Sequence, residues 1–483
     1  MNIQKKHLSL LCICFFAVCS VQAQFFKVFS NILPTEMSTA SVELSNGFVT
    51  ALTESNQQQN FHKNILLVKT DEDGNIIWAK RYDAGTGVSV SLSEMIKTRD
   101  NGLLILGEIS GDNAPDRKRC VLKINAKGNV LWARKYGGGN PYLYHGIAEL
   151  SDSSIIFPYQ TKDFYPGIIH TTRDGKMITA SWFNEARFTR INNIIIANGA
   201  AELTVDNRYL VNMNAATNTI NWQRKYNTSN QFTAMLSNRC ANGDIVCLAG
   251  RTGGGLLNGT ARLFRTKENG QLKWAKNIRI DYNTSGSQFS IFDIVNQVSV
   301  HEDRDGNIVA VVMDESTRNV MAVFNKNGNY LYNRFFTNQY SVFSENTDGT
   351  YFQTSPYTIN GSNPVYSKRS LQTVSDCDSM LPITITNGTD SAAALTPLSL
   401  STGKVSDKSI AITVANVVLT TQNYCSLQNK SFTQKANDFF MQVYPVPAHN
   451  ELRVITKKDL VFTIYDANGK KVMQSMTNSS SNI

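Results

Sequence analysis

The chain is organised by an internal repeat with a period of about 51 residues. Each copy contains an apolar strand pattern, a turn with a glycine, and an aromatic strand with a basic residue two places after its tryptophan. In the first copy these parts are Leu66–Thr70, residues 71–75 and Ile76–Tyr82. The repeated aromatic positions are Trp78, Trp132, Trp222, Trp274 and Tyr332, and a degenerate copy ends at Trp182. Such a repeat restricts the chain to an array of similar units that bury their apolar faces against one another.

This period fits a four-stranded propeller blade and is too long for most helical or leucine-rich units. The segments are rich in β-branched and aromatic residues and are broken about every 8 to 12 residues by Asn-Gly, Asp-Gly or Ser-rich turns. Seven turn signals mark one inner strand per blade, at residues 46–48, 101–103, 153–155, 193–195, 242–244, 305–307 and 348–350. We therefore predict an all-β chain with a seven-bladed β-propeller over residues 24–372, with six or eight blades as alternatives.

The seventh predicted blade, at residues 349–371, lacks the aromatic strand that the other six contain. A similar aromatic, basic, aromatic pattern occurs at Phe25–Phe29, near the start of the chain. Pairing this segment into the last blade would close the ring and remove exposed sheet edges, so we predict that closure. The repeated aromatic residues are expected to pack between neighbouring blades rather than to stack on sugar rings.

Residues 1–23 are predicted to be a secretory signal peptide. Two lysines precede the apolar run 8–18, which is too short to span a bilayer, and cleavage is expected between Ala23 and Gln24. A lipoprotein signal that ends at Cys19 is the alternative, disfavoured because a valine precedes this cysteine where a small residue is needed. No later apolar run is long enough for a membrane-spanning helix, so no transmembrane segment is expected.

The formal net charge of the chain is +9. Its basic residues are spread along the sequence without a block of five or more like charges. This pattern favours a solvated basic surface over nucleic-acid binding.

Five cysteines follow the predicted signal peptide, an odd number for an oxidising compartment. Cys377 and Cys425 bracket one segment outside the repeats and are the candidate disulfide. Cys120 lies in an apolar strand pattern, where a buried free thiol is expected. Cys240 and Cys247 flank a turn but do not oppose each other in the simplest register, so a bond between them is left open. None has the Cys-x-x-Cys spacing of zinc or redox sites.

After residue 372 the sequence becomes rich in serine and threonine. We predict a β-rich connector at 373–427 and a polar linker at 428–440. The last segment, 441–483, begins with a strand stiffened by two prolines and continues with alternating runs joined by an Asn-Gly turn.

This last segment resembles the type A C-terminal sorting domain of the type IX secretion system, a small β-sandwich that guides cargo across the outer membrane. The matching positions are the proline pair Pro445 and Pro447, the second-strand residues Tyr465 and Asp466, and the turn residues Gly469 and Lys470. Val446 stands where the family usually has asparagine, and the chain ends at Ile483, before the family's final strands. A partial sorting domain is therefore expected. The resemblance implies the Sec translocon and the type IX machinery as partners, and a secreted or cell-surface protein that passes through the periplasm.

Catalytic, cofactor-binding and metal-binding residues are not assigned, because no motif for them is recognised. The glycine runs 137–139 and 253–255 lack the Lys-Ser/Thr of a phosphate loop. The segments 71–74 and 303–306 resemble the opening of a calcium loop, but each has its glycine fourth instead of sixth, which favours ordinary hairpin turns. In the second segment the twelfth residue is Asp314, which could supply the carboxylate that a calcium loop has there. A calcium loop is therefore excluded less firmly for the second segment than for the first. The histidines lack metal-ligand spacing and are expected at the surface or in loops.

The repeat also resembles the pyrroloquinoline-quinone-type propeller repeat, most closely at residues 214–222. The adjacent cysteines and the acidic cluster of the quinone-dependent dehydrogenases are missing from this sequence. We therefore predict an exported propeller scaffold without a cofactor that binds a polysaccharide or protein partner. The alternatives are a polysaccharide lyase or hydrolase whose site is assembled from several blades, and a structural component of the cell envelope or gliding apparatus.

Overall fold

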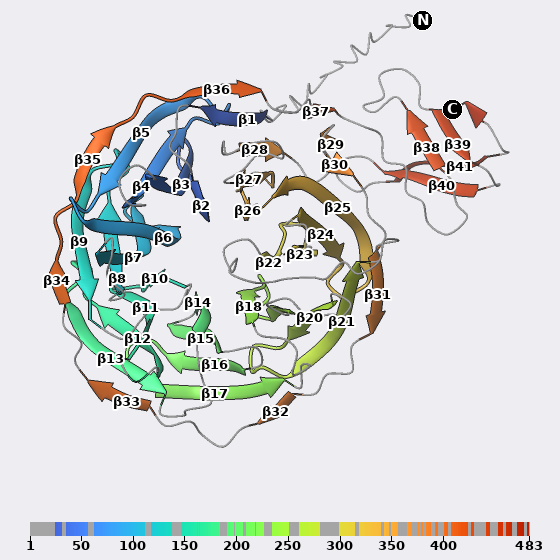
Figure 1. Ribbon diagram of the computed structural model, residues 1–483. Coiled ribbons are helices and arrows are strands. Elements are labelled where there is room, and N and C mark those ends of the chain that lie inside the picture. The colour runs from blue at the N-terminus through green and yellow to red at the C-terminus, as the bar shows by residue number, and fades with distance from the viewer. Residues whose placement is uncertain are drawn as a thin grey trace, which may run out of the picture.

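A computed structural model gives the arrangement of the chain (Figure 1). The described residues are 25–30, 35–56, 62–111, 117–137, 146–161, 163, 165–183, 191–197, 199–205, 209–217, 219–226, 234–250, 260–280, 299–313, 318–339, 342–346, 349–355, 365–369, 374–375, 378–379, 383–387, 392–394, 400–403, 407–423, 427–428, 441–444, 453–456, 460–465, 471–477 and 481–482.

In this part of the chain the strands form seven five-stranded antiparallel sheets arranged around a ring. The first sheet contains β2 (Thr35–Leu44), β3 (Gly47–Asn56), β4 (His62–Thr70) and β5 (Ile76–Asp83). The second contains β6 (Val88–Lys97), β7 (Leu103–Gly111), β8 (Lys118–Ile124) and β9 (Val130–Tyr136). The third contains β10 (Ala148–Glu149), β11 (Ile155–Gln160), β12 (Pro166–Thr171) and β13 (Met177–Phe183).

The next four sheets continue the same order around the ring. They contain β14 (Ile191–Ala197), β15 (Ala200–Val205), β16 (Tyr209–Asn214) and β17 (Thr219–Tyr226); β18 (Ala234–Arg239), β19 (Ile245–Gly250), β20 (Thr260–Thr266) and β21 (Leu272–Ile280); β22 (Ser299–Glu302), β23 (Ile308–Met313), β24 (Arg318–Phe324) and β25 (Tyr330–Gln339); and β26 (Val342–Glu345), β27 (Tyr351–Ser355) and β28 (Val365–Arg369), completed by β1 (Phe25–Ser30).

The hydrophobic core lies between neighbouring sheets. Alternate residues of one strand point to opposite sides, so Val49 on β3 packs with the second sheet while Phe48 packs with Phe29 of the N-terminal strand. The second and third strands of a sheet are therefore buried on both faces, and they appear in the sequence as nearly continuous apolar runs such as Leu103–Leu106. Fully burying one such side chain contributes about 1.5–3 kcal/mol.

The predicted turn signals lie between the first and second strands of the sheets, so they mark the second strand rather than the innermost one. The signal assigned at Asn193 is wrong, because this residue lies inside the innermost strand β14. The turn of that sheet contains Gly199, whose φ of +75° suits a glycine.

The N-terminal strand β1 pairs with β28 in the last sheet, in the register Lys27↔Tyr366, as the aromatic pattern predicted. The first and last strands of the ring thus belong to one sheet, and the ring closes through backbone hydrogen bonds.

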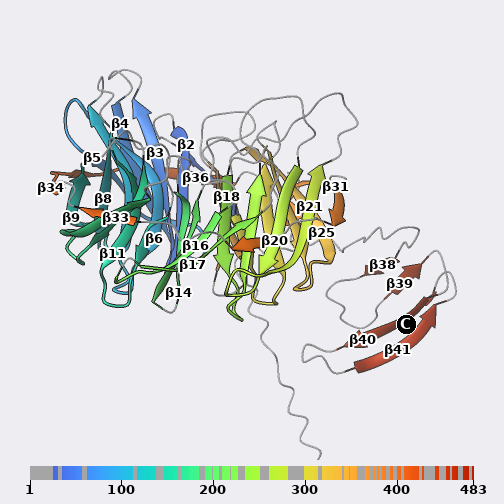
Figure 2. The same ribbon diagram turned by 90° about the horizontal axis from the view of Figure 1, so that it is seen from below.

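Residues 378–423 supply a fifth, outermost strand to every one of these sheets, and we call this segment the belt. Its strands are β30 (Asp378–Ser379) on β25, β31 (Ile383–Asn387) on β21, β32 (Ala392–Ala394) on β17, β33 (Leu400–Gly403) on β13, β34 (Asp407–Ser409) on β9, β35 (Thr413–Asn416) on β5 and β36 (Thr420–Asn423) on β1. Figure 2 shows β34 and β31 on the outer rim at opposite sides of the ring. The expected connector therefore supplies strands to sheets formed by the repeats.

The belt runs around the ring in the direction opposite to the repeats. Fourth strands such as β17 and β21 run along the circumference toward the next sheet (Figure 1). A segment antiparallel to them must advance toward the previous sheet, and the belt does so from the sixth sheet to the first and then to the seventh. Two short strands outside the belt, β29 (Val374–Ser375) and β37 (Leu427–Gln428), pair with each other.

The C-terminal residues form two small antiparallel sheets. One contains β38 (Met441–Tyr444), β39 (Arg453–Thr456) and β42 (Ser481–Asn482), and the other contains β40 (Leu460–Tyr465) and β41 (Lys471–Thr477). Within the described ranges, no helix has the length and apolar character needed to cross a membrane.

Candidate functional site

The two edges of the ring differ in the length of their connections. The turn edge holds the connections between first and second and between third and fourth strands, which contain two to five residues each. The loop edge holds the connections between second and third strands and between successive sheets, which contain two to 18 residues. Because variable loops on a rigid scaffold are the usual place for binding residues, the loop edge is the first place to look for a site.

The turn edge is built from repeated side-chain-capped turns. Asp71 and Asp303, from the two segments that resemble a calcium loop, accept hydrogen bonds from the amides two and four residues later. The amide oxygens of Asn125 and Asn325 accept the same pair of bonds in equivalent turns. Because a neutral asparagine accepts the same two hydrogen bonds, the carboxylates of Asp71 and Asp303 close their turns without needing a charge.

Four tryptophans of the repeat each pack against a turn glycine of the next sheet. At Gly175, where φ is +73°, an added Cβ would lie 2.7 Å from Cζ3 of Trp132. The other pairs are Trp78 with Gly128, Trp222 with Gly270 and Trp274 with Gly328. Only glycine fits this position, because of both the close contact and the positive φ.

Polar groups of the same aromatic strands bind the same turns. Tyr82, Tyr136 and Tyr226 are buried, and their hydroxyls donate to the carbonyls of the turn glycines at 2.8, 2.7 and 2.7 Å. Lys80 donates to the Lys127 carbonyl at 2.7 Å. In the N-terminal strand, Lys27 makes the equivalent contact with the Asp73 carbonyl at 3.0 Å. Tyr332, the repeated aromatic position of the sixth sheet, lies beside the Arg334 guanidinium, with 5.8 Å between the guanidinium carbon and the ring centroid.

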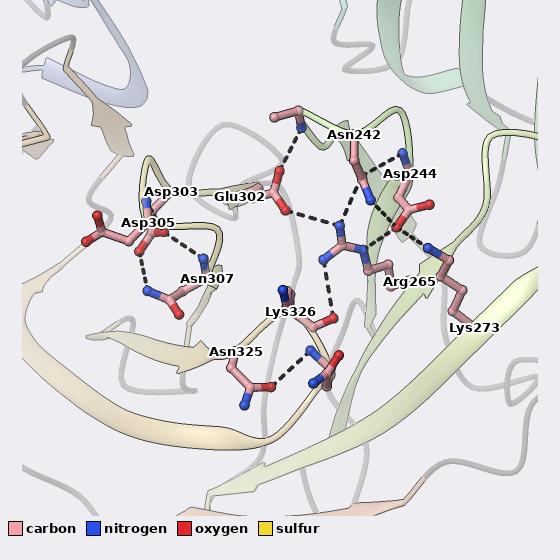
Figure 3. Close-up of polar contacts among 12 residues, drawn as sticks. Asn242, Asp244, Arg265, Lys273, Glu302, Asp303, Asp305, Asn307, Asn325 and Lys326 are labelled. Atoms are coloured by element: carbon pink, nitrogen blue, oxygen red, sulfur yellow. Dashed lines mark hydrogen bonds and ion pairs between the residues drawn. The ribbon is translucent and has the colours of Figure 1, made fainter. Parts of the chain in front are cut away.

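Arg265 on β20 joins the fifth and sixth sheets at the turn edge (Figure 3). Its Nε donates to Asp244 at 2.8 Å, and its Nη2 donates to Glu302 of the next sheet at 3.1 Å. Nη2 also donates to Asn242, and Nη1 donates to the Lys326 carbonyl. Arg265 is only 3% exposed. This buried guanidinium, bonded through all three of its nitrogens, holds the two sheets together.

The charges around Arg265 favour an ionised Asp244. Burial alone raises the pKa of this carboxyl, but the hydrogen bonds from Lys273, Asn242 and Arg265 outweigh burial, so its pKa is lowered. The Lys273 ammonium donates to Asp244 at 2.5 Å.

Glu108 on β7 and Arg119 on β8 lie near the loop edge of the second sheet. Glu94 lies nearer the middle of the innermost strand β6, opposite Leu106, within the field of the Arg119 charge. We call these three residues the loop-edge cluster. Nη1 of Arg119 lies 3.5 Å from Oε1 of Glu108 and 3.2 Å from the Ser93 hydroxyl. Glu94 accepts a hydrogen bond from the amide of Gly146, in the connection to the third sheet. The cluster therefore ties three strands and the next sheet together.

Both carboxyls of the loop-edge cluster hold protons more tightly than usual. Burial raises the pKa of Glu94 to about 7, against the lowering effect of two backbone amides and the Arg119 charge. Burial also raises the pKa of Glu108, against the charges of Arg119, Arg117 and Lys63. Glu108 is 6% exposed and Arg119 is 2% exposed, whereas Glu94 is partly exposed. Within the cluster, Glu94 is thus the group placed to exchange a proton with a solute near neutral pH.

The first sheet has its own charged groups at the loop edge. Arg81 donates from Nε and Nη2 to the fully buried Glu54, at 2.6 and 3.1 Å. His62 Nε2 lies 3.2 Å from Asp83. His62 is buried, as is His170 on β12, so the expectation that the histidines lie at the surface or in loops is wrong for these two.

The loop-edge residues were not predicted, although the sequence contains a signal for them. A charged residue inside an otherwise apolar strand, such as Glu108 after Leu103–Leu106, indicates a buried charge that needs a partner. What the sequence does not show is the partner, because Arg119 faces Glu108 only through the register of β7 and β8.

Several predicted positions lie outside the described residues. These are the signal peptide with Ala23 and Gln24, the cysteines Cys377 and Cys425, and the sorting positions Pro445, Pro447, Asp466, Gly469 and Lys470. Tyr465 is the last residue of β40. Cys120, predicted to be a buried free thiol, is one, and Cys240 and Cys247 are also buried and free.

Residues 442–483 match the family described as the secretion system C-terminal sorting domain, which confirms the resemblance at this end of the chain. None of the curated proteins matches the chain in sequence. Among solved structures, BamB from Moraxella catarrhalis is 9% identical with a TM-score of 0.37, over 70% of this chain and 100% of BamB. Raptor from Chaetomium thermophilum is 9% identical with a TM-score of 0.41, over 72% of this chain and 28% of Raptor.

The ring of sheets defines the class of this protein as an all-β propeller. Its sorting domain marks it as a protein secreted to the cell surface or the extracellular space, with the type IX secretion machinery as its export partner.

Proposed function

We propose that this protein is a seven-bladed propeller that binds a polysaccharide or protein partner through its loop edge, outside the cell. The observation that supports this proposal is the difference between the two edges: connections of two to five residues on one, and of two to 18 on the other. Variation in length without loss of the scaffold is typical of loops that carry recognition.

The contacts that turn-edge residues make within the protein support the same proposal. Its turn glycines and carbonyls are used by the tryptophans, tyrosines and lysines of the preceding sheet, and its Arg265 is buried among protein acceptors. At the loop edge, Arg117 is 56% exposed beside the buried Glu108. A basic group of this kind suits an anionic partner.

The export route is part of the proposal. A signal peptide at 1–23, cleaved between Ala23 and Gln24, delivers the chain to the periplasm through the Sec translocon. The propeller of residues 24–372, the connector 373–427 and the linker 428–440 then cross the outer membrane under the direction of residues 441–483. We assign the guiding role to a small β-sandwich with Pro445, Pro447 and the turn at Gly469 as its recognition positions.

Binding is tested with the mature protein against a panel of immobilised polysaccharides and purified envelope proteins, measured by biolayer interferometry. In one variant a short Gly-Ser linker replaces the 18-residue loop-edge connection 281–298. The control is Lys326→Ala, which removes an exposed cation from the turn edge. We expect the loop variant to lose binding and the control to keep it. Binding that survives the loop replacement but is lost in the control would place the site on the wrong edge.

A polysaccharide lyase or hydrolase is the second candidate, favoured by the pKa of Glu94 near 7 beside the Arg119 charge. The burial of Glu108 and Arg119 favours binding without turnover, because a sugar cannot touch either side chain in this arrangement. Release of reducing ends or unsaturated uronic products, abolished by Glu94→Gln, would establish the enzyme instead.

A further inference from the structure

The belt begins and ends at the same place on the ring. Its first strand lies on the sixth sheet and its last on the neighbouring seventh. Immediately outside these ends, β29 and β37 pair antiparallel, with Val374 opposite Gln428 and Ser375 opposite Leu427. The two ends of the belt are thus held side by side after a full circuit.

The register of this pairing, if continued along both strands, would bring two cysteines opposite each other. In an antiparallel pair, each step forward on one strand is a step back on the other. Two steps beyond Ser375 and Leu427 are Cys377 and Cys425, which themselves lie outside the described residues. Directly opposite residues have Cα atoms about 4.5–5.5 Å apart, within the range of about 4.4–6.8 Å that a disulfide spans.

The other cysteines that follow the predicted signal peptide are unavailable to these two. Cys120, Cys240 and Cys247 are free and buried in the core. Cys240 and Cys247 belong to core clusters on opposite sides of the fifth sheet, which also answers whether they bond to each other. With these three thiols in the core, Cys377 and Cys425 are the two of the five that are left as candidates for a bond.

We propose that Cys377 and Cys425 form a disulfide that closes the belt into a covalent hoop around the ring of sheets. The two thiols lose two protons and two electrons and gain one sulfur–sulfur bond. An oxidised thiol–disulfide oxidoreductase of the export compartment accepts the electrons, and its own disulfide becomes a dithiol.

The hoop would protect the weakest strands of the fold. Belt strands contain two to five residues each, and short edge strands open first from their free ends. The last of them, β36, also covers β1, the strand that closes the ring. Joining the two ends leaves the belt no end from which to peel, so the bond stabilises every sheet edge as well as the closure.

The bond is detected in the unmodified mature protein by counting thiols. Protein denatured without reductant should take up three equivalents of iodoacetamide, and reduced protein should take up five. Proteolytic mapping should then find one peptide pair, joined through Cys377 and Cys425. Five reactive thiols without reductant, or a mapped bond to another cysteine or another chain, would overturn the proposal.

The effect of the hoop is measured by thermal unfolding with and without reductant. We expect reductant to lower the melting temperature of the mature protein by a few degrees and to leave Cys425→Ser unchanged. The control Cys240→Ala should respond as the parent protein does, because its thiol lies in the core. An equal response of Cys425→Ser and the parent would show that the belt is not closed by this bond.

Discussion

Replacing Arg265 by methionine should destabilise the ring more than any change of an exposed charge. The arginine is 3% exposed, and it forms ion pairs with Asp244 and Glu302, whose side chains are 8% and 10% exposed. Methionine fills much of the same volume but leaves both carboxylates without this cation. Breaking a buried ion pair by removing one partner costs about 3–5 kcal/mol. Because Lys273 still contacts Asp244, we expect the lower end, about 3 kcal/mol.

The matched control is Arg173→Met, also at the turn edge. Arg173 lies 3.6 Å from Asp174, and the two side chains are 78% and 63% exposed. Removing an exposed pair of this kind costs less than about 0.5 kcal/mol. The unfolding entropy of about 2.1 cal/mol/K per residue converts 3 kcal/mol into a melting-temperature decrease of about 4 °C for a ring of this size. Thermal and urea unfolding of both variants measure the difference.

The penalty of Arg265→Met should also depend on pH. Because the native pKa of Asp244 is lowered, its contribution to stability is present above the unfolded value near 4 and is lost as the pH falls through the native pKa. The variant lacks the Arg265 part of that contribution, so its deficit should persist from pH 7 down to about pH 4 and should narrow only below that, as Asp244 of the parent takes up a proton. A variant within about 0.5 kcal/mol of the parent at pH 7 would refute the role given to Arg265.

Three further changes test other contacts by the same unfolding measurements. Gly175→Ala should cost more than Gly199→Ala, about 2 against 1 kcal/mol, because both have a positive φ but only Gly175 faces a tryptophan at close range; equal costs would remove the contact from the explanation. Tyr226→Phe should cost about 1–2 kcal/mol by leaving a buried carbonyl unpaired, and an unchanged midpoint would contradict this. Glu94 has a native pKa of about 7, so the parent should lose stability as the pH rises from about 4.5 to 7, and Glu94→Gln should flatten that loss by up to about 3 kcal/mol; parallel pH curves would contradict the raised pKa of Glu94.

The repeats were predictable because their strands pair with sequence neighbours. The apolar run 103–106 and the turn that precedes it determine a strand locally, and the aromatic pattern of Phe25–Phe29 identified the strand that closes the ring. The loop-edge cluster was not predictable, since Glu108 and Arg119 meet only through a register that sequence spacing does not fix.

The position of the belt is the part of the fold that could least be predicted from the sequence. Its residues 411–415 predict a strand, and in the structure Ile410, Ile412 and Val414 pack on the core between the first two sheets. The partners of those strands, however, lie hundreds of residues earlier: Asp407 on β34 contacts Arg134 of β9. No local pattern encodes a pairing at that separation.

The number of belt strands and the number of sheets must agree for the two ends of the belt to meet. The outer strand of each sheet would otherwise present an unpaired edge, and the belt covers these edges one by one with strands that begin on average about seven residues apart. Seven extended residues reach at most about 25 Å, which sets the distance the chain can advance along the rim between sheets. A belt with one strand fewer would stop a sheet short of its start, so β37 would have no β29 beside it. The pairing of β29 with β37 therefore follows from a full circuit, and it places the closure of the belt beside β1, where the repeats close as well.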